Sequence, residues 1–194
     1  MKEQTALRVA VAAGMLSLLT VGLLGYRAYY QMSDALENQP PPSLVSSQSL
    51  TPAEARAAVD AIFDLTLPDL EGRSQPLAQW RGKVLVVNYW ASWCKPCVEE
   101  MPAFSRLNSH YASWGVQFVG IGLDEAVKMQ AFAKKTPVSY PLLVAESAGT
   151  TPGLQVKGLP YTVVIGRDGR IETTHLGRMD EAALEPVLRR LLGQ

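Results

Sequence analysis

A nearly continuous apolar run, residues 83–90, is followed at once by a segment whose apolar residues have helical spacing. The run is rich in β-branched and aromatic residues, which is typical of a parallel strand that is buried on both faces. In the next segment Val98, Met101 and Leu107 fall roughly on one face of a helix. The pattern therefore predicts a strand that leads directly into a helix.

Similar patterns on both sides of this junction predict the rest of one folded domain. Further strands are predicted at residues 62–67, 75–77, 116–123, 158–166 and 170–175, and further helices at residues 51–60, 124–135 and 180–192. Asp124-Glu125 is expected to cap its helix, and Asp168-Gly169 is a strong hairpin turn signal. Strands separated by helices imply a parallel core, to which the hairpin adds antiparallel strands. The predicted fold class is an α/β sandwich with a mixed central sheet flanked by helices.

The N-terminal part of the chain carries a long apolar stretch without any charge, residues 9–26. A stretch of this length can just span the hydrocarbon core of a bilayer. A cleaved signal peptide would need a small-x-small site, which residues 24–27 do not supply, and a buried helix is a less favoured alternative. Lys2 and Arg8 precede the stretch, so the positive-inside rule places the N-terminus in the cytoplasm. We therefore expect an uncleaved, single-pass transmembrane helix, with the rest of the chain outside.

The segment after this stretch, residues 31–50, has the composition of a tether, with three consecutive prolines, several serines and few apolar residues. Thr51-Pro52-Ala53-Glu54 then has the pattern of a helix start. The predicted organisation has three parts: residues 1–30 as a cytoplasmic tip and single transmembrane anchor, residues 31–60 as an extracytoplasmic linker with a short helix, and residues 61–194 as the folded domain.

Length and charge narrow the class of protein. The chain has 194 residues, which is enough for one ordinary domain with extensions. It has 18 basic and 18 acidic residues, whereas a nucleic-acid binder would usually show a basic excess. We therefore expect no nucleic-acid partner.

Both cysteines of the chain, Cys94 and Cys97, fall at the predicted strand-to-helix junction. A helix N-terminus stabilises negative charge through its free N–H groups and its dipole, and Lys95 adds a positive charge. Both effects are expected to lower the pKa of Cys94 from the free value of about 8.5 toward neutrality. Cys97 lies one turn further, within reach to form a disulfide, and Pro96 stiffens the short ring. Two cysteines so placed can exchange a disulfide with another thiol pair.

Two other uses of a cysteine pair fit these residues less well. A zinc site normally takes four ligands, whereas this chain offers one cysteine pair and two isolated histidines, His110 and His175. A purely structural disulfide that closes so small a loop removes little entropy from the unfolded chain. Thiol–disulfide exchange is therefore the favoured interpretation, and no metal or cofactor is expected.

Beyond the cysteine pair, several motifs between residues 63 and 192 resemble the thioredoxin superfamily, and within it the membrane-anchored TlpA/ResA/CcmG-like branch. The motifs that carry the resemblance are Asp69-Leu70-Glu71-Gly72, Arg81-Gly82-Lys83, Val87-Asn88-Tyr89-Trp90-Ala91-Ser92-Trp93-Cys94-Lys95-Pro96-Cys97, Glu100-Met101-Pro102 and Gly158-Leu159-Pro160-Tyr161-Thr162. The resemblance implies a thioredoxin-like fold and the activity of a thiol:disulfide oxidoreductase.

The resemblance also implies roles for individual residues. Cys94 matches the attacking nucleophile, and Cys97 matches the resolving thiol that forms the redox-active disulfide with it. Pro160 matches a cis-proline that lies against the disulfide and helps to bind the partner's backbone. Glu100 matches an acidic residue that can influence the pKa values of the cysteines, and an exposed helix glutamate is the alternative. Glu99 is expected to be solvated.

The resemblance also locates the surface that contacts the partner protein, and it marks one departure. The expected contact residues are Trp93, Lys95, Pro96 and Leu159. Cytoplasmic thioredoxins carry a buried aspartate at the position of Asn88, so proton transfer to Cys97 cannot use that route here. The Lys-Pro pair between the cysteines differs from the Gly-Pro of thioredoxin, which leaves the redox potential open.

We expect a reductase of protein disulfides that is held to a bacterial inner membrane and faces the periplasm. The expected partners are protein disulfides, with the haem-attachment cysteines of apocytochrome c as one candidate, and a membrane electron donor that reduces the pair again. A dithiol oxidase of the same fold is the alternative, because no residue settles the direction of electron flow. A peroxidase is a less favoured alternative, because it would need a Pro-x-x-x-Thr-x-x-Cys signature and the residues before Cys94 do not supply it. A metal-binding chaperone is less favoured as well, because no histidine in the sequence is placed to complete a metal site with the cysteines.

Overall fold

The computed structural model describes residues 26–27, 51–145, 154 and 156–194. Its contacts divide the chain into two units, Met1–Gln48 and Ser49–Gln194, and every helix and strand from α2 to α5 belongs to the second unit. The expected anchor at residues 9–26, apart from Tyr26, and the expected tether at residues 31–50 lie outside the described residues. Among the residues that are described, no helix has the length and apolar character needed to cross a bilayer.

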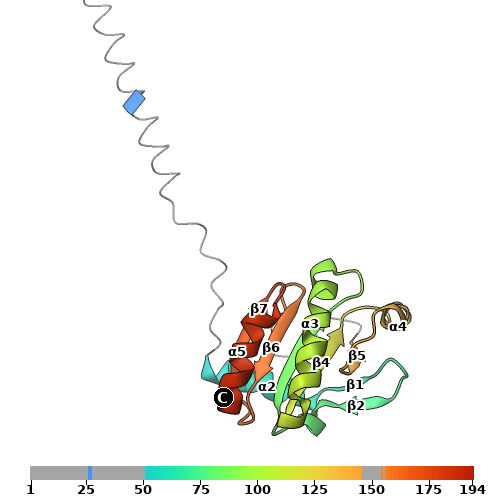
Figure 1. Ribbon diagram of the computed structural model, residues 1–194, viewed down its shortest axis with the longest axis horizontal. Helices are drawn as coiled ribbons and strands as arrows, with labels where there is room; N and C mark the ends of the chain where they lie inside the picture. The colour runs from blue at the N-terminus through green and yellow to red at the C-terminus, as the bar shows by residue number, and fades with distance from the viewer. Residues whose placement is uncertain (1–25, 28–50, 146–153, 155) are drawn as a thin grey trace, which may run out of the picture. The chain divides into compact units, whose positions relative to one another are not determined.

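A five-stranded mixed sheet forms the centre of the domain, in the order β5-β4-β3-β6-β7 (Figure 1). Its strands are β3 (Val84–Trp90), β4 (Val116–Gly122), β5 (Leu142–Val144), β6 (Tyr161–Ile165) and β7 (Ile171–Leu176). β3, β4 and β5 run parallel, whereas β6 pairs antiparallel with β3, and β7 pairs antiparallel with β6. The mixed sheet that the sequence predicts is therefore confirmed, with the fully buried β3 at its centre.

A small antiparallel hairpin, β1 (Thr66–Pro68) and β2 (Ser74–Pro76), precedes the central sheet. The carboxylate of Asp69 holds its turn by accepting the backbone N–H groups of Glu71 and Arg73. Asp69 also forms an isolated antiparallel bridge with Leu143, which ties the hairpin to β5 at the edge of the central sheet.

Helices cover both faces of the central sheet (Figure 1). They are α2 (Pro52–Asp64), α3 (Lys95–Tyr111), α4 (Ala126–Lys135) and α5 (Glu181–Leu192), with short 3-10 helices η1 (Leu77–Trp80) and η2 (Ala112–Trp114). Side chains of β3 alternate between the two faces. Val86 and Trp90 pack with residues of α3, α4 and α5, whereas Leu85 and Val87 pack with α2. Two hydrophobic cores result, one on each side of the sheet.

α2 is longer than the sequence pattern indicates. We expect a helix over residues 51–60 and a strand over residues 62–67, but the helix continues to Asp64 and β1 begins only at Thr66. The strand prediction is therefore wrong for Ile62 and Phe63, which are buried on the helix together with Ala58 and Val59. These four residues form one helical stripe, and burying that stripe against the sheet outweighs the short alternation that suggested a strand.

Candidate active site

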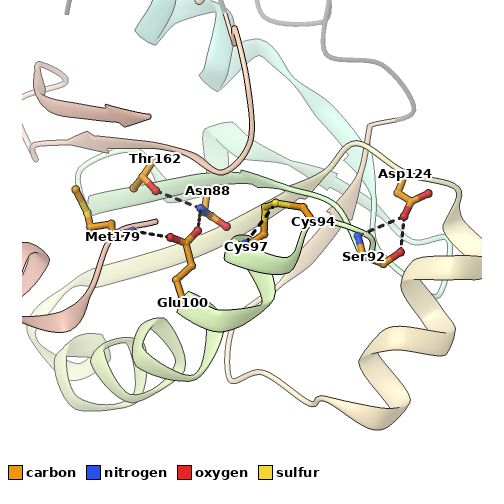
Figure 2. Close-up of a disulfide and its surroundings, with 8 residues drawn as sticks. All are labelled: Asn88, Ser92, Cys94, Cys97, Glu100, Asp124, Thr162 and Met179. Carbon is orange, nitrogen blue, oxygen red and sulfur yellow. Dashed lines mark hydrogen bonds between the residues drawn. A yellow bond between two sulfur atoms is a disulfide. The ribbon is translucent and has the colours of Figure 1, made fainter. Parts of the chain in front are cut away.

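Cys94 and Cys97 form a disulfide at the N-terminus of α3, directly after the loop that leaves β3 (Figure 2). Cys94 is the N-cap residue of the helix, and its Sγ atom accepts the backbone N–H of Cys97 at 3.3 Å. Cys94 is 5% exposed and Cys97 is 0% exposed. The sulfur of Cys94 thus has both an N–H donor and the helix N-terminus beside it, an environment that favours a thiolate.

The expected partner-contact residues surround the more exposed cysteine. Trp93, immediately before Cys94, is 69% exposed, and Lys95 and Pro96 are exposed as well. Leu159 is half-buried in the segment before β6. Their contact with a partner protein stays a prediction.

The peptide bond between Leu159 and Pro160 is cis, as the resemblance implies. Pro160 is buried, and its carbonyl oxygen accepts the backbone N–H of Gly177 at 2.8 Å. This hydrogen bond joins the start of β6 to the end of β7. The contact of Pro160 with the disulfide and with the partner's backbone stays a prediction.

Glu100 is a buried carboxylic acid one turn after Cys97, and it is not the exposed glutamate of the alternative interpretation. Its side chain is 2% exposed. Oε1 accepts Nδ2 of Asn88 and Oε2 accepts the backbone N–H of Met179, both at 2.8 Å (Figure 2). Burial raises the pKa of Glu100 to about 7, against the opposing effects of these two hydrogen bonds and of the positive charge of Arg178. The site therefore contains a carboxyl group that can exchange its proton near neutral pH.

Asn88 links Glu100 to the neighbouring strand. Its Nδ2 atom also donates to Oγ1 of Thr162 in β6 at 3.1 Å, and the residue is 1% exposed. Its Oδ1 atom is buried and has no hydrogen-bond partner among the described residues.

Two residues that contact this group were not predicted as site residues. Thr162 is one of them, although a hydroxyl side chain within the apolar β6 was a signal for it. Nothing in the sequence marks Met179, because it contributes only its backbone N–H.

A second group of charged residues lies at the exposed rim of the cysteine pair. Glu99 is part-exposed and lies between Lys95, at 3.9 Å, and Arg178, at 3.4 Å. The prediction that Glu99 is solvated agrees with this exposure. Because all three side chains reach water, these ion pairs are expected to add little stability.

Asp124 binds a residue that the sequence does not indicate. We expect Asp124-Glu125 to cap the following helix, and Glu125 is the N-cap residue of α4, although its side chain makes no capping bond. The carboxylate of Asp124 instead accepts the hydroxyl of Ser92 and, at 3.3 Å, the backbone N–H of Ser92 (Figure 2). Burial alone would raise the pKa of Asp124, but the hydrogen bonds from Ser92 and from the backbone N–H of Glu125 hold it below its usual value.

The described residues contain no cluster of three or more His, Cys, Asp or Glu side chains that could hold a metal ion. His175 lies on β7, where its Nε2 atom is 3.3 Å from the carbonyl oxygen of Arg178. The reactive groups that lie together here are the two cysteines and the buried carboxyl group of Glu100, whose role stays a prediction.

A disulfide at the start of a helix that follows the central strand of a mixed sheet defines the class of protein: a thiol–disulfide oxidoreductase with a thioredoxin-like fold. The sequence model of the Redoxin family matches residues 56–192, so the chain belongs to the Redoxin family. The resemblance to ResA-like members of the thioredoxin superfamily is confirmed by the relatives that follow.

Two similar proteins are both thiol-disulfide oxidoreductases. The chain is 31% identical to the thiol-disulfide oxidoreductase ResA of Halalkalibacterium halodurans over 132 residues, which cover 68% of this chain and 74% of that protein. It is 28% identical to the ResA of Geobacillus thermodenitrificans over 180 residues, which cover 92% of each chain. Among solved structures, DsbF of MTB, in its mixed oxidised and reduced forms, is similar with a TM-score of 0.60 and 27% identity, over 68% of this chain and 97% of that one.

Proposed function

We propose that this thiol–disulfide oxidoreductase works as a reductase of protein disulfides, held to a bacterial inner membrane with its catalytic domain in the periplasm. The observation that carries the direction of electron flow is the burial of Glu100 beside the cysteine pair. A buried carboxylate that is shielded from water disfavours a second negative charge nearby. It therefore destabilises the thiolate form of the reduced pair, and a pair whose reduced form is less stable gives up its electrons more readily.

The proposed reaction begins with the thiolate of Cys94. Its sulfur attacks one sulfur of the partner's disulfide, which breaks that bond and releases one partner thiolate while a mixed disulfide forms. Cys97 then loses its proton, with the carboxylate of Glu100 as the proposed acceptor, and its sulfur attacks Cys94 Sγ. The mixed disulfide breaks, the second partner thiolate leaves, and Cys94 and Cys97 end as the disulfide seen in Figure 2. Two electrons pass to the partner, which takes up two protons, one from Cys97 through Glu100 and one from solvent.

The proposed partners follow from the compartment. Disulfides form and persist in oxidising compartments, so a protein that needs free thiols there needs a dedicated reductant. The haem-attachment cysteines of apocytochrome c are the proposed substrate, because haem attachment requires them reduced. The pair would be reduced again by a membrane electron donor, and thiol–disulfide exchange itself needs no cofactor.

The membrane tether rests on residues 9–26, which contain no charge and are long enough to span a bilayer core. An alkaline phosphatase fused after Gln194 would test the proposed orientation, because this reporter is active only outside the cytoplasm. We expect phosphatase activity together with retention of the fusion in membranes after carbonate extraction. A fusion that is released from the membranes would contradict the tether. A fusion without phosphatase activity would contradict the proposed orientation.

A dithiol oxidase remains the second candidate, since one observation favours it. The N–H of Cys97 is aimed at Cys94 Sγ, and Lys95 is adjacent, so the thiolate of Cys94 is stabilised. A stabilised thiolate makes the reduced form more stable and the disulfide more oxidising. The two candidates therefore differ in whether the carboxylate of Glu100 or the donors around Cys94 have the larger effect.

The reduction potential of the full chain decides between the two directions. It is measured by equilibration in dithiol and glutathione buffers while tryptophan fluorescence is followed, because Trp90 ends β3 and Trp93 precedes Cys94. We expect a potential near or below that of thioredoxin, about −270 mV. A potential near that of DsbA, about −120 mV, would contradict the reductase and support the oxidase.

A further inference from the structure

The amide oxygen of Asn88 is a buried acceptor without a donor. Asn88 is 1% exposed, and its Oδ1 atom has no hydrogen-bond partner among the described residues. Buried side-chain oxygens are nearly always hydrogen-bonded, so an unpaired one needs an explanation. A partner that exists only in another state of the enzyme is one such explanation.

The orientation of this amide is fixed by its neighbours. The NH₂ of Asn88 faces Glu100 and donates to its Oε1 at 2.8 Å, as the proposed mechanism requires, because the ionised carboxylate that receives the proton of Cys97 can only accept hydrogen bonds. The second hydrogen of the same Asn88 nitrogen is donated to Oγ1 of Thr162, at an N–O distance of 3.1 Å. Turning the amide over would leave Glu100 without this donor, and the oxygen is therefore held on the opposite side.

On that side lies the cysteine pair. Asn88 stands between Val86 and Trp90 on β3, so its side chain projects from the face of the sheet on which those two residues pack with Cys97. Cys97 and Glu100 are three residues apart on α3, on one face of the helix. Figure 2 shows the nitrogen of Asn88 turned to Glu100 and Thr162, and its oxygen turned toward Cys97.

Reduction of the disulfide creates the missing donor. Neither sulfur carries a hydrogen in the disulfide, but each sulfur can carry one after reduction. Cys97 is 0% exposed, so its S–H cannot be satisfied by bulk water. Cys94 Sγ already accepts the N–H of Cys97 and is therefore suited to be the thiolate, which needs donors. Cys97 is left as the thiol, which needs an acceptor.

We propose that Oδ1 of Asn88 accepts the S–H of Cys97 in the reduced enzyme and thereby fixes which cysteine holds the proton. Asn88 is a positioning residue in this arrangement. Its oxygen keeps Cys97 protonated while Cys94 attacks, and its nitrogen keeps Glu100 beside the thiol that must later lose its proton. The inference rests on the exchange chemistry of the proposed function, but it holds for either direction of electron flow.

The proton then moves within a defined set of groups. In the resolving step the S–H proton of Cys97 passes to the carboxylate of Glu100, the new thiolate attacks Cys94 Sγ, and the bond from Cys94 to the partner breaks. Within the part of the chain that the structure describes, the other charged or titratable groups that interact with Glu100 are Arg178, after β7, and Tyr140, before β5. Tyr140 stays neutral through this step, because burial and the charge of Glu100 raise its pKa.

The S–H stretching band tests the proposed hydrogen bond directly. The chain has two cysteines, so the Cys94→Ser variant of the full chain contains a single thiol, that of Cys97. We expect its Raman S–H band at lower wavenumber in the native protein than in the same protein unfolded in urea. The shift should be lost in Cys94→Ser/Asn88→Leu and kept in Cys94→Ser/Thr162→Val, which removes a neighbouring partner of Asn88 but leaves its oxygen. A native band at the unfolded position, or a shift that survives Asn88→Leu, would overturn the proposal.

A second measurement needs no substitution and stays decisive if Asn88→Leu does not fold. Chain labelled with ¹³C at the asparagine side-chain carbonyl is compared in its disulfide and dithiol forms by infrared difference spectroscopy. We expect one asparagine carbonyl band to shift to lower wavenumber on reduction. Asn108 serves as an internal control, because its oxygen already accepts the N–H of Phe118. The absence of any asparagine band in the difference spectrum would contradict the inference, and since no substrate is used, that result would leave the reductase proposal standing.

Discussion

The carboxylate of Asp124 accepts both the hydroxyl and the backbone N–H of Ser92, two residues before Cys94. Ser92 lies in the loop between β3 and α3, and Asp124 lies between β4 and α4. The two loops at the carboxyl ends of neighbouring parallel strands are thus joined by one side chain. The position of the loop that presents the redox pair therefore depends on a residue outside the motif.

Removing this carboxylate should destabilise the domain. In Asp124→Ala, three donors lose their acceptor: the hydroxyl and N–H of Ser92 and the N–H of Glu125. We expect a loss of about 1–3 kcal/mol in the free energy of unfolding, measured with urea, because these groups lie in a largely buried place. Ser92→Ala is the matched control, since it removes one donor and leaves the others paired, and it should cost less. Equal losses in the two variants would show that Asp124 does not hold the loop.

Glu100 should make stability depend on pH. Its pKa is raised from the usual 4.5 to about 7 by burial, so between these values the folded protein holds a proton that the unfolded chain has lost. The free energy of unfolding should therefore fall as the pH rises through this window, by roughly 3 kcal/mol in total, and stay low above it. Urea unfolding of the oxidised protein between about pH 4 and pH 9 measures this slope.

Glu100→Gln should flatten that dependence, because the side chain no longer titrates. The control is Glu99→Gln at the preceding helix residue, whose carboxylate is exposed and pairs with the exposed Lys95 and Arg178. It should leave the slope unchanged. If wild type and Glu100→Gln had parallel profiles, Glu100 would not be the group that titrates near neutrality.

Cys97→Ser should trap partner proteins on Cys94 as mixed disulfides. The attack by Cys94 still occurs, but no second thiol is available to break the bond that it forms. The trapped species are detected on non-reducing gels after the thiols of living cells have been blocked with acid and alkylating agent. Cys94→Ser should trap far less, because Cys97 is 0% exposed and cannot meet a partner's disulfide. A lack of trapped species in Cys97→Ser would count against the order of attack.

Gly120 allows a close approach between β4 and its neighbours. A Cβ atom there would lie 2.6 Å from Leu142 Cδ2 and 3.1 Å from Trp90 Nε1. Both side chains are buried, so Gly120→Ala should cost about 1–3 kcal/mol in the free energy of unfolding. The cost should be smaller when Leu142→Ala is already present, because the atom nearest to the new methyl group is then gone. An additive double variant would show that the crowding does not involve Leu142.

The sequence predicts best those features that depend on residues close together in the chain. The strand–CxxC–helix junction and the hairpin at Asp168-Gly169 are both recognised from short segments, and both are confirmed. The hydrogen bonds of Glu100 could not be predicted in this way. They come from Asn88, 12 positions away, and from Met179, 79 positions away, and the second is a backbone group with no side-chain signal.

Errors arise where one short pattern fits two structures. The alternation of apolar and polar residues around Ile62 suggested a strand. The same apolar residues continue the buried stripe of α2, and the helix forms because it packs this stripe against the sheet. Asp124-Glu125 directly before a helix suggested a cap, and Glu125 is the N-cap residue, but the carboxylate of Asp124 binds Ser92. In both cases contact with a distant part of the chain overrides the local preference.

The difference in burial between the two cysteines also has a consequence for oxidative damage. Cys94 is 5% exposed and Cys97 is 0% exposed, so a peroxide that reaches the reduced pair meets the sulfur of Cys94. The sulfenic acid formed there lies beside a protected thiol at disulfide distance, with the two Cα atoms 5.3 Å apart. Condensation releases water and returns the ordinary disulfide before a second oxidant molecule can carry the sulfur to the irreversible sulfinic acid. The recessed sulfur of Cys97 would thus protect Cys94 from irreversible oxidation whenever the reduced pair meets a peroxide.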